Sequence, residues 1–171
     1  MQKNRVICNK KWRLLRSKLL GKGAFGKVFL GEEIKTGREV AIKEIAFDKD
    51  DDELIQRQLQ EILTMMKYSV RPQTNLLRII DFALEQDHIY LVLEYCEGGS
   101  LEDYMEMDMQ NGNLPDIEAE KKALKIAHQI ALGLSVLHKE FGIAHRDLKP
   151  EHVLCKGGSY LLSNFGSSTQ Q

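Results

Sequence analysis

The hydrophobic period of this chain changes from that of strands to that of helices, and this change constrains the fold more than any other feature. Between Leu14 and Ile45, short apolar runs alternate with glycine clusters and with Thr36-Gly37, which predicts three antiparallel strands joined by tight turns. Apolar residues then recur at helical spacing behind the acidic residues 48–53, which favour a helix N-terminus. These apolar positions are Leu54, Ile55, Leu59, Ile62, Leu63 and Met66.

Further strands and one longer helix complete the expected elements. The apolar spacing after Asp116, a suitable N-cap residue, predicts an amphipathic helix that continues to His138. Strands are expected at 77–83 and 89–95, and short strands at 153–154 and 160–162 around the turn Gly157-Gly158. The pattern predicts an α+β fold, with five antiparallel strands and one helix followed by a mainly helical part.

Composition and charge narrow the class of protein. The 171 residues suit one domain, and a net charge of −1 argues against a nucleic-acid-binding surface, which usually carries a basic excess. No apolar run is long enough for a membrane span, and Arg13 and Arg16 interrupt the apolar residues that a signal peptide would need. Three cysteines without metal or disulfide spacing predict reduced thiols, and therefore a cytoplasmic location with a nuclear one as the alternative.

The segment Gly21-Lys22-Gly23-Ala24-Phe25-Gly26-Lys27-Val28 is a candidate phosphate-binding loop, since glycines let backbone N–H groups approach phosphate oxygens. A hairpin that needs permissive glycines is the simpler alternative. A dinucleotide-binding loop would open a helix, whereas Val28 begins a strand-like run. A P-loop would match Gly21, Gly26 and Lys27 but requires Ser or Thr where Val28 stands.

A lysine in the apolar run Val40-Ala41-Ile42-Lys43 needs an anionic partner. The loop and this lysine together resemble the small lobe of a protein kinase. In that family the lysine contacts the α- and β-phosphates of ATP and pairs with a glutamate on the next helix. The resemblance places Glu61 in that role, with Glu53 as the less favoured candidate.

The run 91–101, which ends in Glu94-Tyr95-Cys96-Glu97-Gly98-Gly99-Ser100-Leu101, resembles the hinge of a kinase. The resemblance implies that backbone groups near Glu94 and Cys96 bind the adenine edge, with Leu93 as gatekeeper. It implies a nucleotide site made by Leu20, Gly21, Lys22, Gly23, Ala24, Phe25, Gly26, Val28, Ala41, Lys43, Glu94, Cys96, Ser100 and Leu154.

The block His145-Arg146-Asp147-Leu148-Lys149-Pro150-Glu151 resembles the catalytic loop of the same family. By this resemblance Asp147 accepts the proton of the substrate hydroxyl and Lys149 steadies the transferred phosphoryl group. Lysine two places after the aspartate is typical of serine/threonine kinases. The implied reaction is phosphoryl transfer from ATP to Ser or Thr of a protein substrate, with Lys43, Glu61, Asp147 and Lys149 as catalytic residues.

Two positions depart from the family. His152 stands where a magnesium-binding Asn is expected, and Asn164 in Asn164-Phe165-Gly166 stands where the second magnesium ligand, an Asp, is expected. Magnesium prefers charged or carbonyl oxygen ligands, and neutral imidazole favours softer metals. Weak magnesium binding and impaired phosphoryl transfer are therefore expected. The alternative is a pseudokinase that binds nucleotide or a protein partner as a scaffold.

The resemblance predicts a partial kinase domain over 1–171, because the match stops soon after Asn164. Its parts are a small lobe at 13–95, a hinge at 96–100 and the start of a large lobe at 101–171, with nucleotide in the cleft. The chain is then expected to be a fragment, or a protein whose apolar helix stripe needs a partner. Cys8 and the basic N-terminal stretch are assigned to a surface lead-in.

Overall fold

The computed structural model describes residues 4–23, 26–47, 52–69, 75–85, 87–110, 117–165 and 169–170. The chain forms two compact units, one made by residues 1–66 and 78–95 and the other by residues 67–77 and 96–171. One division between the units falls after Tyr95, and residues 67–77 belong to the second unit. No helix in the described part of the chain is long and apolar enough to cross a membrane.

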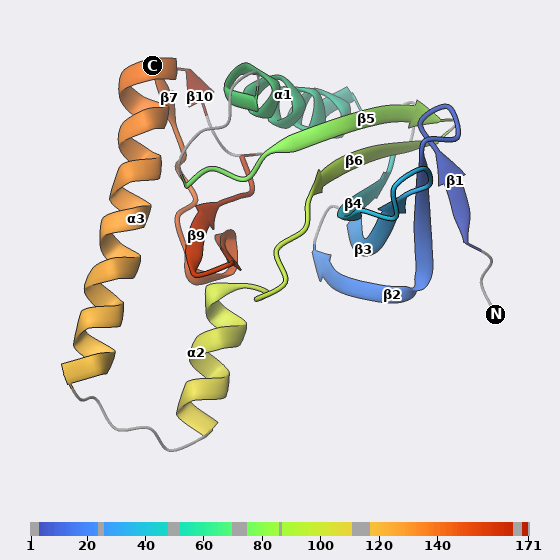
Figure 1. Cartoon of the computed structure of the whole chain (residues 1–171). Helices are drawn as coiled ribbons and strands as arrows, with labels where there is room; N and C mark the ends of the chain where they lie inside the picture. The colour runs from blue at the N-terminus through green and yellow to red at the C-terminus, as the bar shows by residue number, and fades with distance from the viewer. Residues whose placement is uncertain are drawn as a thin grey trace. The chain divides into compact units, whose positions relative to one another are not determined.

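The first unit is a curled antiparallel sheet with most of one helix, α1 (Asp52–Ser69), whose last three residues belong to the second unit (Figure 1). The strand order is β1-β2-β3-β4-β6-β5, so chain neighbours are mostly paired and β5 lies at one edge. The strands are β1 (Arg5–Ile7), β2 (Trp12–Gly23), β3 (Gly26–Glu33), β4 (Glu39–Ala46), β5 (Ile79–Glu85) and β6 (His88–Glu94). The α+β class and the small-lobe architecture are confirmed, with six strands in place of the five predicted.

The additional strand corrects the assignment of the N-terminal stretch to a surface lead-in. Arg5 pairs with Leu14 and Ile7 with Trp12, and Ile7 is 1% exposed. The backbone N–H of Cys8 donates to Glu85 Oε1 at 3.1 Å. This segment is therefore a structural strand, held by a backbone ladder and by a buried apolar side chain.

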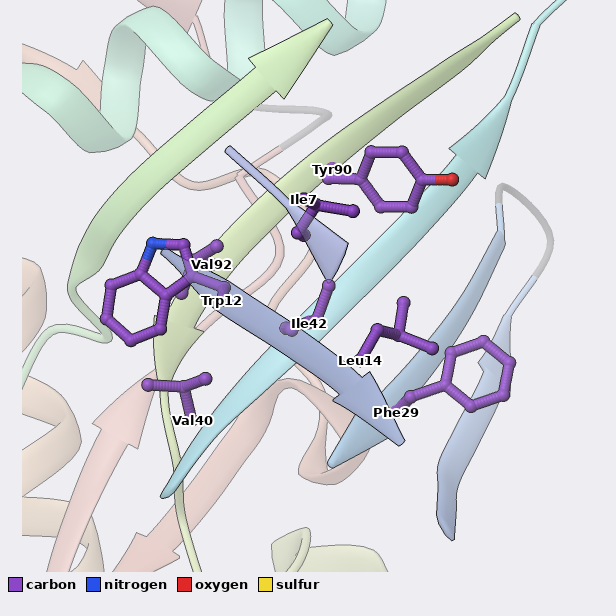
Figure 2. Close-up of a cluster of buried hydrophobic side chains, with 8 residues drawn as sticks. All are labelled: Ile7, Trp12, Leu14, Phe29, Val40, Ile42, Tyr90 and Val92. Carbon is purple, nitrogen blue, oxygen red and sulfur yellow. The ribbon is translucent and has the colours of Figure 1, made fainter. Parts of the chain in front are cut away.

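The core of the first unit is a cluster of apolar side chains on the inner face of the curled sheet. Figure 2 shows these residues, which come from five of the six strands: Ile7, Trp12, Leu14, Phe29, Val40, Ile42, Tyr90 and Val92. Alternation in β2 and β4 directs every second side chain into this cluster, as the period of a strand requires. The indole N–H of Trp12 donates to Asp81 Oδ2 at 2.8 Å, so its polar atom is satisfied.

A charged network continues this inner face. Both guanidinium NH2 groups of Arg16 hydrogen-bond the carboxylate of Glu44, and the hydroxyl of Tyr90 donates to Glu44 Oε1 at 3.1 Å. Burial would raise the pKa of Glu44, but the hydrogen bonds and charge of Arg16 outweigh burial and lower it. Arg16 lies on β2 and Glu44 lies on β4, so this ion pair joins the two strands that flank β3 in the sheet.

The second unit contains two helices, two small sheets and a short 3-10 helix. Helix α3 packs against β9 and β7, and α2 packs against η1 and β8. The elements are α2 (Leu101–Gln110), α3 (Ile117–Phe141), β7 (Ile143–Ala144), η1 (Pro150–His152), β8 (Val153–Lys156), β9 (Ser159–Leu162) and β10 (Thr169–Gln170). The predicted long helix and the β8–β9 strands are present, and the predicted N-cap Asp116 lies outside the described residues.

Helix α2 was not predicted from the apolar pattern. Its N-terminus is a capping box, in which the N–H of Asp103 donates to Ser100 Oγ at 3.1 Å and the N–H of Ser100 donates to Asp103 Oδ2 at 3.0 Å. The hydrogen bonds that Asp103 Oδ2 accepts from the hydroxyl and the N–H of Ser100 lower the pKa of Asp103. The signal for this helix was therefore in its capping residues.

Strand β9 leads directly into the segment that carries Asn164 and is held by backbone bonds on both sides. The N–H of Leu162 donates to Asn75 O at 2.9 Å, and the N–H of Leu77 donates to Leu162 O at 2.8 Å. On the other side β9 pairs with β8 through the turn Gly157-Gly158, whose positive φ angles suit a two-residue hairpin. The start of the 163–165 segment is thus fixed by the sheet.

The two ion pairs of β2 allow a matched test of the buried network. We expect Arg16→Met to lower the free energy of unfolding by about 2–4 kcal/mol, because Glu44 is left buried without its partner. Arg13→Met changes another arginine of β2 and removes its half-exposed pair with Glu32 of β3, which should cost less than about 1 kcal/mol. Urea unfolding of both variants measures the difference, and equal losses would show that burial of Glu44 contributes nothing.

Candidate functional site

Lys43 and Glu61 form an ion pair in the first unit. Lys43 lies in the middle of β4, where it pairs with Val28 of β3 and Leu91 of β6. Its Nζ donates to Glu61 Oε1 at 3.0 Å and to Oε2 at 2.9 Å. Glu61 projects from α1 and is 3% exposed. The glutamate predicted to pair with Lys43 is therefore the residue that does so.

The glycines of the loop between β2 and β3 differ in what they pack against. A Cβ on Gly26 would lie 2.2 Å from the carbonyl oxygen of Glu44, so this position requires glycine for packing. Among the described residues, no atom lies within 4 Å of a Cβ placed on Gly21 or Gly23. Packing therefore explains why residue 26 is glycine and does not explain Gly21 and Gly23. Ala24 and Phe25 lie outside the described residues.

The segment after β6 was predicted to bind the adenine edge. In the first unit, the carboxylate of Glu94 accepts a hydrogen bond from the N–H of Arg78 at 2.8 Å. In the second unit, Cys96 is buried and Ser100 forms an isolated bridge with Leu154. The Ser100 hydroxyl is engaged in the α2 capping box. The roles of these residues toward a nucleotide stay predictions.

His145 is the buried residue that shapes the catalytic loop of the second unit. Its Nε2 donates to the carbonyl oxygen of Ser163 at 2.9 Å, and its Nδ1 accepts the N–H of Asp147 at 3.3 Å. Burial lowers the pKa of His145, which agrees with a neutral ring that donates at one nitrogen and accepts at the other. Its ring contacts Phe165 edge to face, with centroids 5.2 Å apart. The loop and the 163–165 segment are thus joined through one side chain.

Asp147 and Lys149 lie on the exposed side of this loop. The side chain of Asp147 is 41% exposed, as a residue that contacts a substrate must be before the substrate binds. Lys149 Nζ lies 2.5 Å from Glu151 Oε2, in a pair whose two side chains are both accessible to solvent. The hydrogen bond and charge of Glu151 raise the pKa of Lys149, which keeps it a cation.

His152 and Asn164, the two residues at the expected metal positions, contact each other. Asn164 Nδ2 lies 2.5 Å from His152 Nε2, and His152 Nδ1 lies 2.7 Å from Asp147 O. Neutral imidazole and a side-chain amide are a poor ligand set for magnesium. The described residues contain no group of three His, Cys, Asp or Glu side chains that could hold a metal ion. The residues present do not fit the magnesium that this kind of site would use.

Neither the role of Ser163 nor the contact between His152 and Asn164 was predicted from the sequence. The N–H and the hydroxyl of Ser163 both donate to His152 O, at 2.8 Å and 3.1 Å. Ser163 O accepts the hydrogen bond from His145. No sequence signal marks a residue whose contribution is made largely through backbone atoms, whereas the two substituted residues were identified singly and not as a pair.

These features define a class of protein. A lysine in the central part of an antiparallel sheet paired with a helix glutamate, a glycine-rich turn and a loop carrying His-Arg-Asp are the parts of a phosphoryl-transfer fold of the kinase type. The family model for the protein kinase domain matches residues 14–171. The chain belongs to the protein kinase family.

Curated relatives agree with this assignment. The chain is 34% identical over 165 residues to serine/threonine-protein kinase pkn2 of Myxococcus xanthus, with 94% of the chain and 18% of the relative covered. It is 35% identical over 161 residues to serine/threonine-protein kinase PrkC of Bacillus subtilis, covering 93% of the chain and 23% of the relative. It is 36% identical over 135 residues to serine/threonine-protein kinase ATG1c of Arabidopsis thaliana, covering 79% and 17%. The chain thus spans less than a quarter of the length of each of these three relatives.

Replacing each of the three loop glycines by alanine should change the free energy of unfolding by different amounts. We expect Gly26→Ala to lower the free energy of unfolding by about 1–3 kcal/mol, because its Cβ would overlap backbone atoms of β4. Gly21→Ala and Gly23→Ala should change it by less than about 0.5 kcal/mol, since their surroundings are open. Thermal unfolding of the three variants measures this, and a loss of the same size at Gly21 would indicate a packing role there as well.

Proposed function

We propose that this chain is the nucleotide-binding part of a serine/threonine-type protein kinase domain, that it binds ATP, and that its phosphoryl transfer is strongly impaired. The observation that carries ATP binding is the ion pair between Lys43 and Glu61, which sets an ammonium group in a fixed place next to a glycine-rich loop. Each unit contributes its own residues to the proposal.

Lys43 retains capacity for an anionic ligand. Its ammonium group has three N–H donors, and Glu61 accepts from it at both carboxylate oxygens. One donor therefore remains for a phosphate oxygen as far as the described residues are concerned. The carboxylate fixes the direction of this third donor, so part of the cost of ordering the lysine is met before the nucleotide binds.

Gly21 and Gly23 support the same role for the loop. Their Cβ positions are open, so packing among the described residues does not require glycine there. Phosphate binding does, because backbone N–H groups reach phosphate oxygens more closely without a Cβ. The hairpin alternative accounts for Gly26 and leaves the other two without a reason.

In the second unit, Asp147 is proposed to accept the proton of an alcohol and Lys149 to contact the phosphoryl group. The exposed pair of Lys149 with Glu151 contributes little energy, so the lysine can exchange this partner for a phosphate. Asp147 is accessible and its backbone is held by His145. The parts for proton acceptance are therefore present.

Impairment follows from the pair at the metal positions. Phosphoryl transfer depends largely on positioning and on charge stabilisation, and the contact between His152 and Asn164 supplies neither a cation nor an anionic ligand for one. This observation also favours the second candidate, a scaffold that binds nucleotide or a protein partner without transfer. Three free thiols are the basis for proposing a reducing compartment such as the cytoplasm.

ATP binding is tested by thermal shift with a matched lysine. We expect ATP without metal to raise the melting temperature, because a ligand of the folded state stabilises it by mass action. Lys43→Met should weaken ATP binding by about tenfold to a hundredfold, the range for a hydrogen bond to a charged group. Each variant is compared with its own ligand-free melting temperature, since loss of the Lys43 ammonium group leaves Glu61 unpaired.

The control is Lys27→Met on β3, at the position a P-loop would use. ATP binding should survive this change. Loss of binding with Lys27→Met and retention with Lys43→Met would favour the P-loop alternative, and no shift for the unaltered protein would overturn the proposal of ATP binding.

Impaired transfer is tested with ATP, magnesium and a generic Ser/Thr-containing acceptor protein. We expect labelled phosphate incorporation to stay at the level of an Asp147→Asn variant, which keeps the shape of the side chain and removes the proton acceptor. Incorporation clearly above that variant would identify an active kinase and would contradict both the impairment and the scaffold alternative.

A further inference from the structure

The second unit contains a closed set of hydrogen bonds around the positions at which kinases place their metal ligands. His145 accepts from the N–H of Asp147 and donates to Ser163 O. His152 contacts Asp147 O through Nδ1, and its own carbonyl accepts from Ser163. Asn164 Nδ2 completes the set at His152 Nε2. The catalytic loop and the 163–165 segment are linked at each step by protein atoms.

The direction of each bond fixes the state of His152. A carbonyl oxygen accepts only, so Nδ1 of His152 carries the proton donated to Asp147 O. An amide NH2 group donates only, so Nε2 accepts with its lone pair from Asn164 Nδ2. Both ring nitrogens of His152 thereby have a partner, and His152 is 8% exposed, so loss of either hydrogen bond would leave a buried nitrogen without a partner.

The hydrogen bond leaves no ligand atom facing an ion. A divalent ion needs a lone pair from each of its ligands. The lone pair of His152 Nε2 accepts from Asn164, and the amide of Asn164 directs an N–H group, which cannot bind a metal, at the imidazole. An ion could enter only if this contact were broken and the amide turned.

We infer that the hydrogen bond between His152 and Asn164 takes the place of the divalent ion, closing its position and joining the catalytic loop to the 163–165 segment without metal. The inference concerns the site of the proposed function and deepens it, since nucleotide would then bind without a divalent ion at this position. Asn is suited to position 164 for two reasons. Its φ there is 62°, an angle that Asn tolerates better than most residues. Its amide also supplies the N–H donor that an ionised Asp would lack.

The first test is nuclear magnetic resonance of the unaltered protein without nucleotide. The imidazole nitrogens of His152 should report a proton on Nδ1 and an acceptor at Nε2. Millimolar manganese, a paramagnetic ion, should broaden the signals of His152 and of the Asn164 amide no more than those of His88. His88 is the matched control, because it has an exposed carboxylate beside it in the pair with Asp87. Selective broadening at His152 and Asn164, or a ring protonated at Nε2, would overturn the inference.

The second test restores the family's residues. The double variant His152→Asn, Asn164→Asp should gain a rise in melting temperature with magnesium, whereas the unaltered protein should respond to magnesium no more than to sodium chloride of equal ionic strength. A double variant as insensitive as the unaltered protein would show that the contact does not exclude the ion, and would also overturn the inference. Neither test contains ATP, so failure of ATP binding would count against the proposed function alone.

Discussion

A lysine in the interior of a sheet requires an anion beside it, and the arrangement of the first unit depends on this requirement. Lys43 lies on β4, the strand between β3 and β6. Burying its ammonium group there without a partner would cost free energy. Glu61 is nearly fully buried and has the same need. Each charge is tolerable only with the other, so the ion pair links α1 to β4. It also holds the ammonium group of Lys43 near the glycine-rich loop that joins β2 and β3.

The features that could be predicted are those set by short-range patterns. The strand period of β4, the helical spacing of α3 and the glycine turn between β8 and β9 are each contained in a few successive residues. The burial of Lys43 predicted only that it needs an anionic partner. The choice of Glu61 came from the resemblance to protein kinases, in which this lysine pairs with a glutamate on the next helix.

The features that could not be predicted depend on partners distant in the chain or on signals other than apolar period. Ile7 is buried because β1 pairs with β2 and lies over the sheet core, and three residues of strand have no pattern of their own. Helix α2 is polar along much of its length, and its signal is the reciprocal cap of Ser100 and Asp103. Two residues can each be recognised as unusual in sequence, as His152 and Asn164 were, without any indication that they satisfy one another.

The same physical rule governs Lys43 in the first unit and His152 in the second. A buried polar group must have a partner, and the partner determines what else can bind. Glu61 accepts from Lys43 and leaves one donor for a phosphate. Asn164 donates to the second nitrogen of His152, so this imidazole has no lone pair left for a metal. The chain thus keeps the residue arrangement that favours an anion and replaces the one that favours a cation, and this difference is the basis for proposing nucleotide binding without efficient metal-dependent transfer.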